Sequence, residues 1–220
     1  MKRIPEKEVM DDLANAQAYA AADFSEPHNF FISKFLEKFP YPNHFKQVID
    51  PGCGSCDVTM RFANAVKQCA IDAFDASPPM LQLADVAIKK QGLTDRISLS
   101  HLYLDAFTTF AAHYELLISN SLLHHLHSAN YLWQAIHKVL LPGGAVFIMD
   151  LARPASIEAA LVLTEKYAAN EPEVLRQDFY HSLLAAYTVE EVEMQLREND
   201  LQQLSVEMVT DRHFIVYGTL

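Results

Sequence analysis

The sequence predicts an α/β fold with a mostly parallel sheet between layers of helices. Short apolar runs recur along the chain (QVID, AIDAFD, ISLSHLYL, YELLISN, AVFIMDL), and most are separated by stretches of helical periodicity (VTMRFANAV, PPMLQLADVAIKK, YLWQAIHKVL). This βαβ alternation is typical of parallel sheets, and nearly continuous apolar strands require cover on both faces. With 220 residues, half of them hydrophobic, we expect one core and a single domain, 1–220.

The first 43 residues are expected to form a helical flap ahead of a core at 44–152. Apolar residues recur at helical spacing from Val9 to Ala20 and from Phe31 to Phe39, and the turn-like stretch FSEPHN separates them. We therefore predict two N-terminal helices. Within the core, Ser77 followed by a proline marks a helix start, and the stretch LPGG at 141–144 ends a helix and leads into the next strand.

The pattern changes after Leu151. Residues 153–187 form a long helical insertion, and Thr188 with Glu191 makes a capping box that begins a helix reaching Glu198. Two β-like runs, LSVEMV and HFIVYGTL, then lie only a few residues apart. They predict an antiparallel hairpin in a C-terminal unit at 188–220.

Composition restricts the partners and the compartment. The formal net charge of −11 and the absence of a Lys/Arg run argue against nucleic acid and against acidic membrane surfaces. No segment has the length and apolar character of a membrane span or a signal sequence, and three cysteines do not suggest a disulfide framework. We expect a cytoplasmic protein, and a homodimer remains open.

The stretch VIDPGCGSCDV, residues 48–58, is the first candidate for chemistry. Gly52 and Gly54 suit a tight turn that lets the backbone approach a ligand, at the end of a strand where doubly wound sheets bind ligands. The helix that follows directs its N–H groups at the same place. A dinucleotide fingerprint needs a third glycine where this chain has Asp57, whereas Asp75, at the end of the next strand, suits the two hydroxyls of a ribose.

Five stretches together resemble the successive motifs of class I S-adenosylmethionine-dependent methyltransferases. They are VIDPGCGS, AFDASPPML, LYLDAF, LLISNSLLHHL and VLLPGGAVFIMD, in the expected order across residues 48–150. The nearest type is the ubiquinone- and menaquinone-biosynthesis-like group that acts on small molecules. The resemblance implies a Rossmann-like three-layer sandwich: a mostly parallel seven-stranded sheet with an antiparallel C-terminal hairpin strand, and extra helices forming a lid.

The resemblance also assigns a set of residues to S-adenosyl-L-methionine, whose product is S-adenosyl-L-homocysteine. Residues of the glycine loop would hold the methionine part, Asp75 the ribose, the next residues and Asp105 the adenine, and Asn120 would lie at the methyl end. An N-terminal aromatic pair would close over the cofactor, with core packing as the competing interpretation. The full set is Tyr19, Phe24, Asp50, Gly52, Cys53, Gly54, Asp75, Ala76, Met80, Asp105, the backbone N–H of Ala106, and Asn120.

The cysteines and histidines have alternative interpretations. Many members of the family have a glycine where this chain has Cys56, so cofactor affinity depends on how the cysteine fits. Cys53 and Cys56 have redox spacing, but two small residues in a tight loop are the favoured interpretation. His124, His125 and His127 lack a carboxylate partner in the sequence, so no metal site is expected. His124 or His125 is instead a candidate base, with a structural loop histidine as the alternative.

The insertion is expected to cover the active site and to exclude water. It contributes Tyr180 and His181 as further candidate catalytic residues. Arg153 and Arg176 are candidates to clamp a carboxylate of the substrate, although surface arginines are usually solvated.

The function expected is methyl transfer from S-adenosyl-L-methionine to a small molecule. Two alternatives stay open. The first is a non-catalytic member that binds cofactor or partner, motivated by Cys56. The second, disfavoured by Asp57, is an NAD-dependent oxidoreductase.

Overall fold

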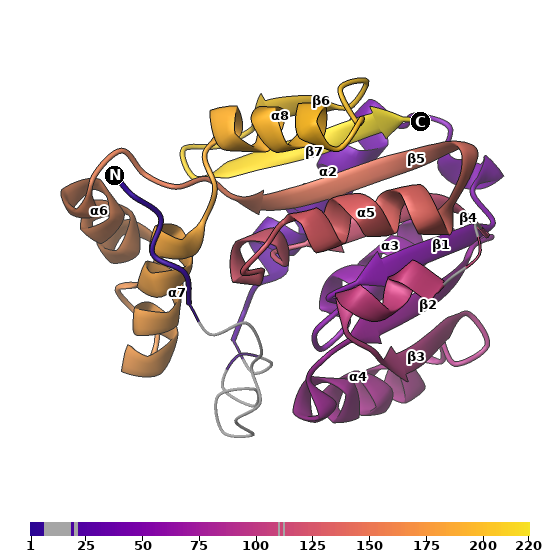
Figure 1. The fold of residues 1–220 in the computed structure, drawn as a ribbon. Coiled ribbons are helices and arrows are strands. Elements are labelled where there is room, and N and C mark those ends of the chain that lie inside the picture. Colours follow the sequence, from indigo (N-terminus) through magenta and orange to yellow (C-terminus); the bar gives the residue numbers. More distant parts are fainter. Residues whose placement is uncertain (7–18, 20–21, 110, 112) are drawn as a thin grey trace.

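A seven-stranded sheet forms the centre of the molecule (Figure 1). The computed structural model describes residues 1–6, 19, 22–109, 111 and 113–220. The strands are β1 (Gln47–Pro51), β2 (Ala70–Asp75), β3 (Ile97–His101), β4 (Tyr114–Asn120), β5 (Leu140–Leu151), β6 (Ser205–Met208) and β7 (His213–Thr219), in the order β3-β2-β1-β4-β5-β7-β6. Strands β1 to β5 pair in parallel, and β7 is antiparallel to both β5 and β6. The predicted mostly parallel seven-stranded sheet with an antiparallel C-terminal strand is confirmed.

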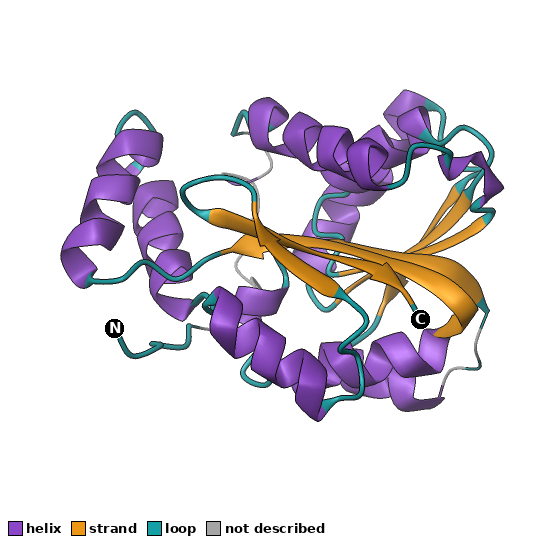
Figure 2. Cartoon of the chain, turned by 90° about the horizontal axis from the view of Figure 1, so that it is seen from above, coloured by secondary structure: helices purple, strands orange, loops and turns teal. Residues whose placement is uncertain are grey.

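Helices cover both faces of the sheet, as a view from above shows (Figure 2). One face packs on α2 (Ser25–Lys38), α3 (Asp57–Ala65) and α4 (Pro78–Gln91), and the other packs on α5 (Asn130–Val139) and α8 (Val189–Glu198). Neighbouring strand residues alternate between these two cores: Val48 joins the first and Ile49 the second. Because both faces are buried, the strand sequences are apolar throughout rather than alternating.

Two further helices form a separate layer at one end of the sheet. They are α6 (Ile157–Ala168) and α7 (Glu173–Ala185), which pack on each other around Leu151 and Leu183 (Figure 1). The N-terminal residues 1–6 run along this layer: the amino group of Met1 donates to the carbonyl of Ala155, and the Ile4 N–H donates to the carbonyl of Leu184.

Two predicted boundaries were wrong. The stretch FSEPHN is not a turn, because α2 already begins at Ser25. Pro27 is tolerated there since the first N–H groups of a helix have no intrahelical partner. The LPGG stretch at 141–144 lies within β5, which begins directly after α5, and Leu140 already pairs with Tyr114 before a register shift. The predicted helix over residues 9–20 lies, except for Tyr19, outside the described residues.

Other local predictions are confirmed. The Ser77 side chain accepts from the Met80 N–H at the start of α4, and Thr188 and Glu191 form both hydrogen bonds of a capping box at the start of α8. Within the part of the chain that the structure describes, no helix has both the length and the apolar character needed to cross a bilayer.

Candidate functional site

The strand order reverses between β1 and β4, and a cavity lies at the carboxyl ends of these strands and of β2. Asp50, Asp75 and Asn120 come from the ends of the three strands, and all line it. The glycine loop after β1 contributes Gly52, Cys53 and Gly54, and the start of α4 contributes Ser77 and Met80. This is where open α/β sheets bind ligands.

The glycine loop is held by backbone hydrogen bonds to β2. The N–H groups of Gly52 and Cys53 donate to the carbonyl of Phe74 at 2.7 and 3.0 Å, and the Gly54 N–H donates to a carboxylate oxygen of Asp75 at 2.8 Å. Gly52 has φ of +73°, and a Cβ there would lie 2.7 Å from a Leu122 methyl. Gly52 is therefore required by close packing as well as by its backbone conformation.

Two carboxyl groups at this cavity have raised pKa values. Burial raises the pKa of Asp50 to about 7, although the Thr59 hydroxyl donates to it at 2.6 Å, and the negative Asp75 contributes in the same direction. Burial also raises the pKa of Asp75, against the hydrogen bonds from the N–H groups of Ser77 and Gly54. The cavity therefore has two acids whose ionised forms a cationic ligand would stabilise.

Cys56, which replaces a glycine common in the resembled family, adopts the left-handed conformation with φ of +63°. Its side chain is fully buried in the core of α3 and does not line the cavity. A hydrogen bond with Cys56 and burial raise the pKa of the Cys53 thiol well above its ordinary value. A redox centre needs a readily formed thiolate, so the raised pKa of Cys53 does not support the redox alternative.

The adenine side of the predicted site is less complete. Among the described residues that line the cavity, Met80 is present, whereas Ala76, Asp105 and Ala106 are not. The carbonyl of Ala76 contacts the His101 ring at 3.0 Å, and the Ala106 N–H donates to the carbonyl of Tyr103. Asp105 lies in η2 (Leu104–Thr109), the short 3₁₀ helix after β3.

Asp57 has a structural partner that its sequence position does not indicate. Its carboxylate contacts the His28 ring at 2.6 Å and accepts from Arg61 at 2.8 Å, and these contacts lower its pKa to about 2. His28 belongs to α2 and Asp57 begins α3, so the pair joins the N-terminal helix to the glycine loop. Both residues line the first cavity.

A larger cavity of about 510 Å³ adjoins the first. The two share part of their wall, formed by Tyr19, His28, Asn120, Ser121 and His125. The larger cavity extends under α6 and α7, as predicted for a lid, with Tyr167, Leu175, Phe179 and His181 in its wall. The predicted aromatic pair lies at the junction: the rings of Tyr19 and Phe24 are 4.7 Å apart between centroids, Tyr19 lines both cavities and Phe24 lines the larger one.

Both candidate histidines face the larger cavity, each with a carboxylate partner. His124 Nδ1 lies 2.5 Å from Asp150 Oδ1 at the end of β5, and His125 Nδ1 lies 3.0 Å from Glu6 Oε1. Although burial opposes both shifts, the His124–Asp150 contact raises the pKa of His124 and lowers that of Asp150. The expectation that these histidines lack a carboxylate was wrong, because chain folding supplies Glu6 and Asp150.

The predicted arginine clamp is not assembled. The Arg153 side chain is 5% exposed, and it pairs with Glu191 of α8 and donates to the carbonyl of Ala186. Arg176 pairs with Glu173 within α7. Neither arginine, nor Tyr180, is among the described residues that line the cavities, whereas His181 lines the larger one. The prediction of a clamp was wrong, because each guanidinium group already pairs with a carboxylate of the chain: Arg153 with Glu191 of α8, and Arg176 with Glu173 of its own helix.

Comparison with known proteins matches part of the sequence to a family model and the whole fold to solved structures. The family model described as "Methyltransferase domain" matches residues 48–144, and no curated protein matches the sequence. Among solved structures, an S-adenosylmethionine-dependent methyltransferase from Aquifex aeolicus is 16% identical with a TM-score of 0.69, covering 94% of this chain and 98% of that one. A candidate methyltransferase of the same kind from Methanococcus maripaludis is 17% identical with a TM-score of 0.72, covering 97% and 95%.

A third similar structure contains ligands. Phosphoethanolamine N-methyltransferase 2 of Haemonchus contortus, solved with phosphomonomethylethanolamine and S-adenosylhomocysteine, is 16% identical with a TM-score of 0.64, covering 83% of this chain and 39% of that one. The similar structures support the fold of this chain, and the family model supports a methyltransferase domain that contains the glycine loop. The chain therefore has the class I S-adenosylmethionine-dependent methyltransferase fold, with a methyltransferase domain at residues 48–144.

Proposed function

We propose that the protein transfers the methyl group of S-adenosyl-L-methionine to a small molecule held in the larger cavity. The observation that carries this proposal is the wall shared by the two cavities. A donor in the first cavity and an acceptor in the second meet at Asn120, Ser121 and His125. Methyl transfer needs this adjacency, because most of the rate gain in such a reaction comes from aligning two bound reactants.

The first cavity fits the charge of the proposed cofactor. S-adenosyl-L-methionine carries a sulfonium and an ammonium group, and Asp50 and Asp75 place two carboxyl groups in the cavity wall. Burial raises the pKa of both groups, and a bound cation would favour their ionised forms. The Oδ1 atom of Asn120 is buried and has no hydrogen-bond partner among the described residues. A buried acceptor of this kind normally has a partner, so a donor from a ligand would complete it. Gly54, beside which a Cβ would meet only open space, leaves the loop surface accessible.

The larger cavity suits an acceptor that is neutral or cationic. Among the described residues of its wall, one is an arginine and five are acidic: Glu6, Asp23, Glu26, Glu171 and Asp178. That arginine, Arg212, lies 3.3 Å over the ring of Tyr167 and contacts Asp211, so its charge is already partnered. An anionic acceptor would meet repulsion here.

In the proposed reaction the residues of the chain bind, orient and exclude water. The lid of α6 and α7 and the rings of Tyr19 and Phe24 shield the junction of the two cavities. Where the acceptor must lose a proton, His125 is the candidate base. Both His28 and His125 line the two cavities, but His28 Nδ1 already contacts the Asp57 carboxylate.

Calorimetric titration with S-adenosyl-L-methionine and S-adenosyl-L-homocysteine tests the first step. Asp75→Asn should weaken binding at least tenfold, because the neutral amide cannot attract the cofactor or accept two hydroxyl bonds. Asp72→Asn is the matched control: it lies on the same strand, and its carboxylate contacts Ser98 and Tyr114 rather than the cavity. Failure of the wild type to bind, or equal affinity of Asp75→Asn, would contradict the proposal.

A methylation assay tests the second step. The acceptors should include matched pairs of small amines or alcohols and the corresponding carboxylic acids. We expect turnover only with the neutral or cationic members. Tight cofactor binding without turnover of any acceptor would instead support the non-catalytic alternative.

A further inference from the structure

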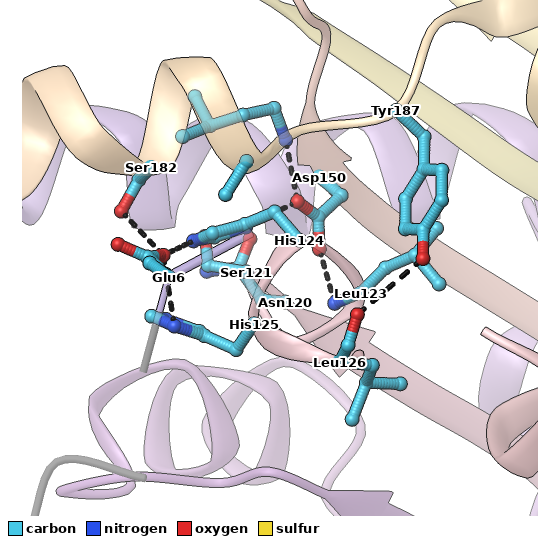
Figure 3. Close-up of polar contacts among 12 residues, drawn as sticks. Glu6, Asn120, Ser121, Leu123, His124, His125, Leu126, Asp150, Ser182 and Tyr187 are labelled. Carbon is cyan, nitrogen blue, oxygen red and sulfur yellow. Dashed lines mark hydrogen bonds and ion pairs between the residues drawn. The ribbon is translucent and has the colours of Figure 1, made fainter. Parts of the chain in front are cut away.

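We propose that Glu6, His124 and His125 bind one divalent transition metal ion, such as Zn²⁺, in the wall of the larger cavity. These three residues are called the Glu-His-His cluster below. Figure 3 shows the Glu6 carboxylate between the two imidazole rings, with Asn120 and Ser121 beside them. The metal binding stands on its own; only its role in methyl transfer rests on the proposed function.

The ligand atoms are already close to the spacing that a metal requires. Glu6 Oε1 lies 3.0 Å from His125 Nδ1 and 3.8 Å from His124 Nε2, and the three candidate ligand atoms lie within 4.8 Å of one another. Tetrahedral ligands at about 2.0 Å from Zn²⁺ are separated by about 3.3 Å. Movements of less than about 1 Å would therefore complete the site. Two imidazoles and one carboxylate are a donor set for Zn²⁺, Co²⁺ or Fe²⁺ rather than for Mg²⁺.

His124 is held as a metal-binding histidine usually is. Its Nδ1 faces Asp150 Oδ1 at 2.5 Å, and the Asp150 carboxylate accepts from the N–H groups of Leu123 and Leu151, each at 2.7 Å. Because Asp150 is 1% exposed and fully bonded, the proton of a neutral His124 lies on Nδ1. The Nε2 lone pair then points to Glu6. A carboxylate, imidazole and metal in this sequence is the common arrangement of zinc sites.

Glu6 is placed by specific contacts, although it belongs to the N-terminal segment. Arg3, on the same segment, donates to the carbonyls of His124 at 2.9 Å and Leu126 at 2.8 Å, and its guanidinium lies 4.1 Å over the Tyr187 ring. The Ser182 hydroxyl of α7 donates to Glu6 Oε1 at 3.1 Å. Arg3 therefore attaches the segment to the loop that carries the histidines, and Ser182 attaches Glu6 to α7. These contacts hold the carboxylate in position, as a metal ligand requires.

One carboxylate oxygen lies between the two imidazoles, because Glu6 Oε1 faces His125 Nδ1 at 3.0 Å and His124 Nε2 at 3.8 Å. Protons on the rings can satisfy these contacts, and a metal ion would compete with those protons for the same ligand atoms. A metal ion accepts all three electron pairs at once. Three protein ligands also leave a fourth position open, which distinguishes reactive zinc sites from structural ones.

The position of the cluster indicates what the metal would do. Glu6, His124 and His125 all line the larger cavity, and His125 also lines the cofactor cavity. If the proposed function is correct, the metal supplies Lewis-acid chemistry there and lowers the pKa of an acceptor hydroxyl or thiol, whose proton leaves to solvent. The cluster would then replace a separate general base.

Metal uptake by the full chain tests the site. Protein stripped with a chelator is dialysed against Zn²⁺ or Co²⁺, bound metal is counted by mass spectrometry, and the Co²⁺ form is followed by its visible spectrum. We expect one equivalent in the wild type. Each of Glu6→Gln, His125→Ala and Asp150→Asn should weaken binding at least tenfold. His127→Ala, in the same HHLH segment but outside the cluster, is the matched control and should bind like the wild type.

The outcomes separate this inference from the proposed function. No tight equivalent in the wild type, or equal loss in His127→Ala and His125→Ala, would overturn the site. Among these variants, Glu6→Gln should disturb the folded structure least, because glutamine has nearly the size of glutamate and Glu6 packs in neither of the two large cores. S-adenosyl-L-methionine binding is measured on the same samples: cofactor binding without metal uptake refutes only the cluster, and metal uptake without cofactor binding refutes only the proposed function.

Discussion

Cofactor affinity should increase with pH because of Asp50. This carboxyl group is 3% exposed, its pKa is about 7, and it lines the cavity proposed for the cofactor. Between about pH 4 and 7 the folded protein therefore keeps a proton on Asp50 that the unfolded chain has lost, and burial makes ionisation unfavourable. A ligand with an ammonium and a sulfonium group favours the ionised form, so binding should release this proton.

The size of the effect follows from the pKa. A carboxyl group with pKa about 7 is roughly nine-tenths protonated at pH 6 and about a quarter protonated at pH 7.5. If the complex requires the ionised form, affinity rises about eightfold over this interval, or about 1.3 kcal/mol. About 0.9 proton should leave per ligand bound at pH 6.

Calorimetry in two buffers of different ionisation enthalpy measures both quantities. An α-amino group with a pKa of about 7.7–8.0 is itself partly deprotonated at pH 7.5, so the titration of the free ligand is measured separately and subtracted. Asp50→Asn should abolish the pH dependence and the proton release, while Asp72→Asn should preserve both. Affinity that does not change between pH 6 and 7.5 in the wild type would refute the reasoning, as would an unchanged slope in Asp50→Asn.

Three predictions concern stability, measured by urea unfolding. Asp150→Asn should lower the free energy of unfolding by about 3–5 kcal/mol, because it breaks a buried pair with His124. The pair should contribute most to stability between about pH 4 and 6.5. At lower pH Asp150 gains a proton and at higher pH His124 loses one, so the contribution decreases in both directions. Gly52→Ala should cost about 1–3 kcal/mol, through its positive φ and the contact with Leu122, and Gly54→Ala, which meets open space, about 1 kcal/mol. Arg96→Leu should lower the free energy of unfolding by about 3 kcal/mol or more, because the Arg96 guanidinium donates to the carbonyls of Ala63 in the last turn of α3 and of Val66 and Cys69 after it. Arg96→Lys should recover only part of this loss.

The cavity proposed for the cofactor was largely predictable because it is built from strand ends. In a parallel sheet the carboxyl ends of the strands meet at one edge, so a strand assignment alone brings Asp50, Asp75 and Asn120 together. The errors here are local. Asp105 and Ala106 lie on a short 3₁₀ helix whose direction no periodicity reveals, and the Ala106 N–H turned out to have a partner within its own loop.

The larger cavity was less predictable because its contacts join segments far apart in the chain. Arg153 has the residue type of a substrate clamp, but its partner Glu191 stands on a helix that packs beside it only in the fold. Glu6 has no motif around it. Asp150 did have a signal, since it ends an apolar strand in the same way as Asp50 and Asp75.

This difference in construction has a consequence for specificity. The proposed cofactor cavity depends on the sheet and its hydrogen-bonded loop, whereas the larger cavity is closed by residues 1–6, by α2 and by α6 and α7. Helices α6 and α7 have a small core of their own, separate from the two large cores beside the sheet. Substitutions in this layer therefore disturb fewer packed neighbours than substitutions at the strand ends. We expect acceptor preference to change through α6, α7 and the N-terminal segment, while the cofactor cavity keeps the same charges and the same loop.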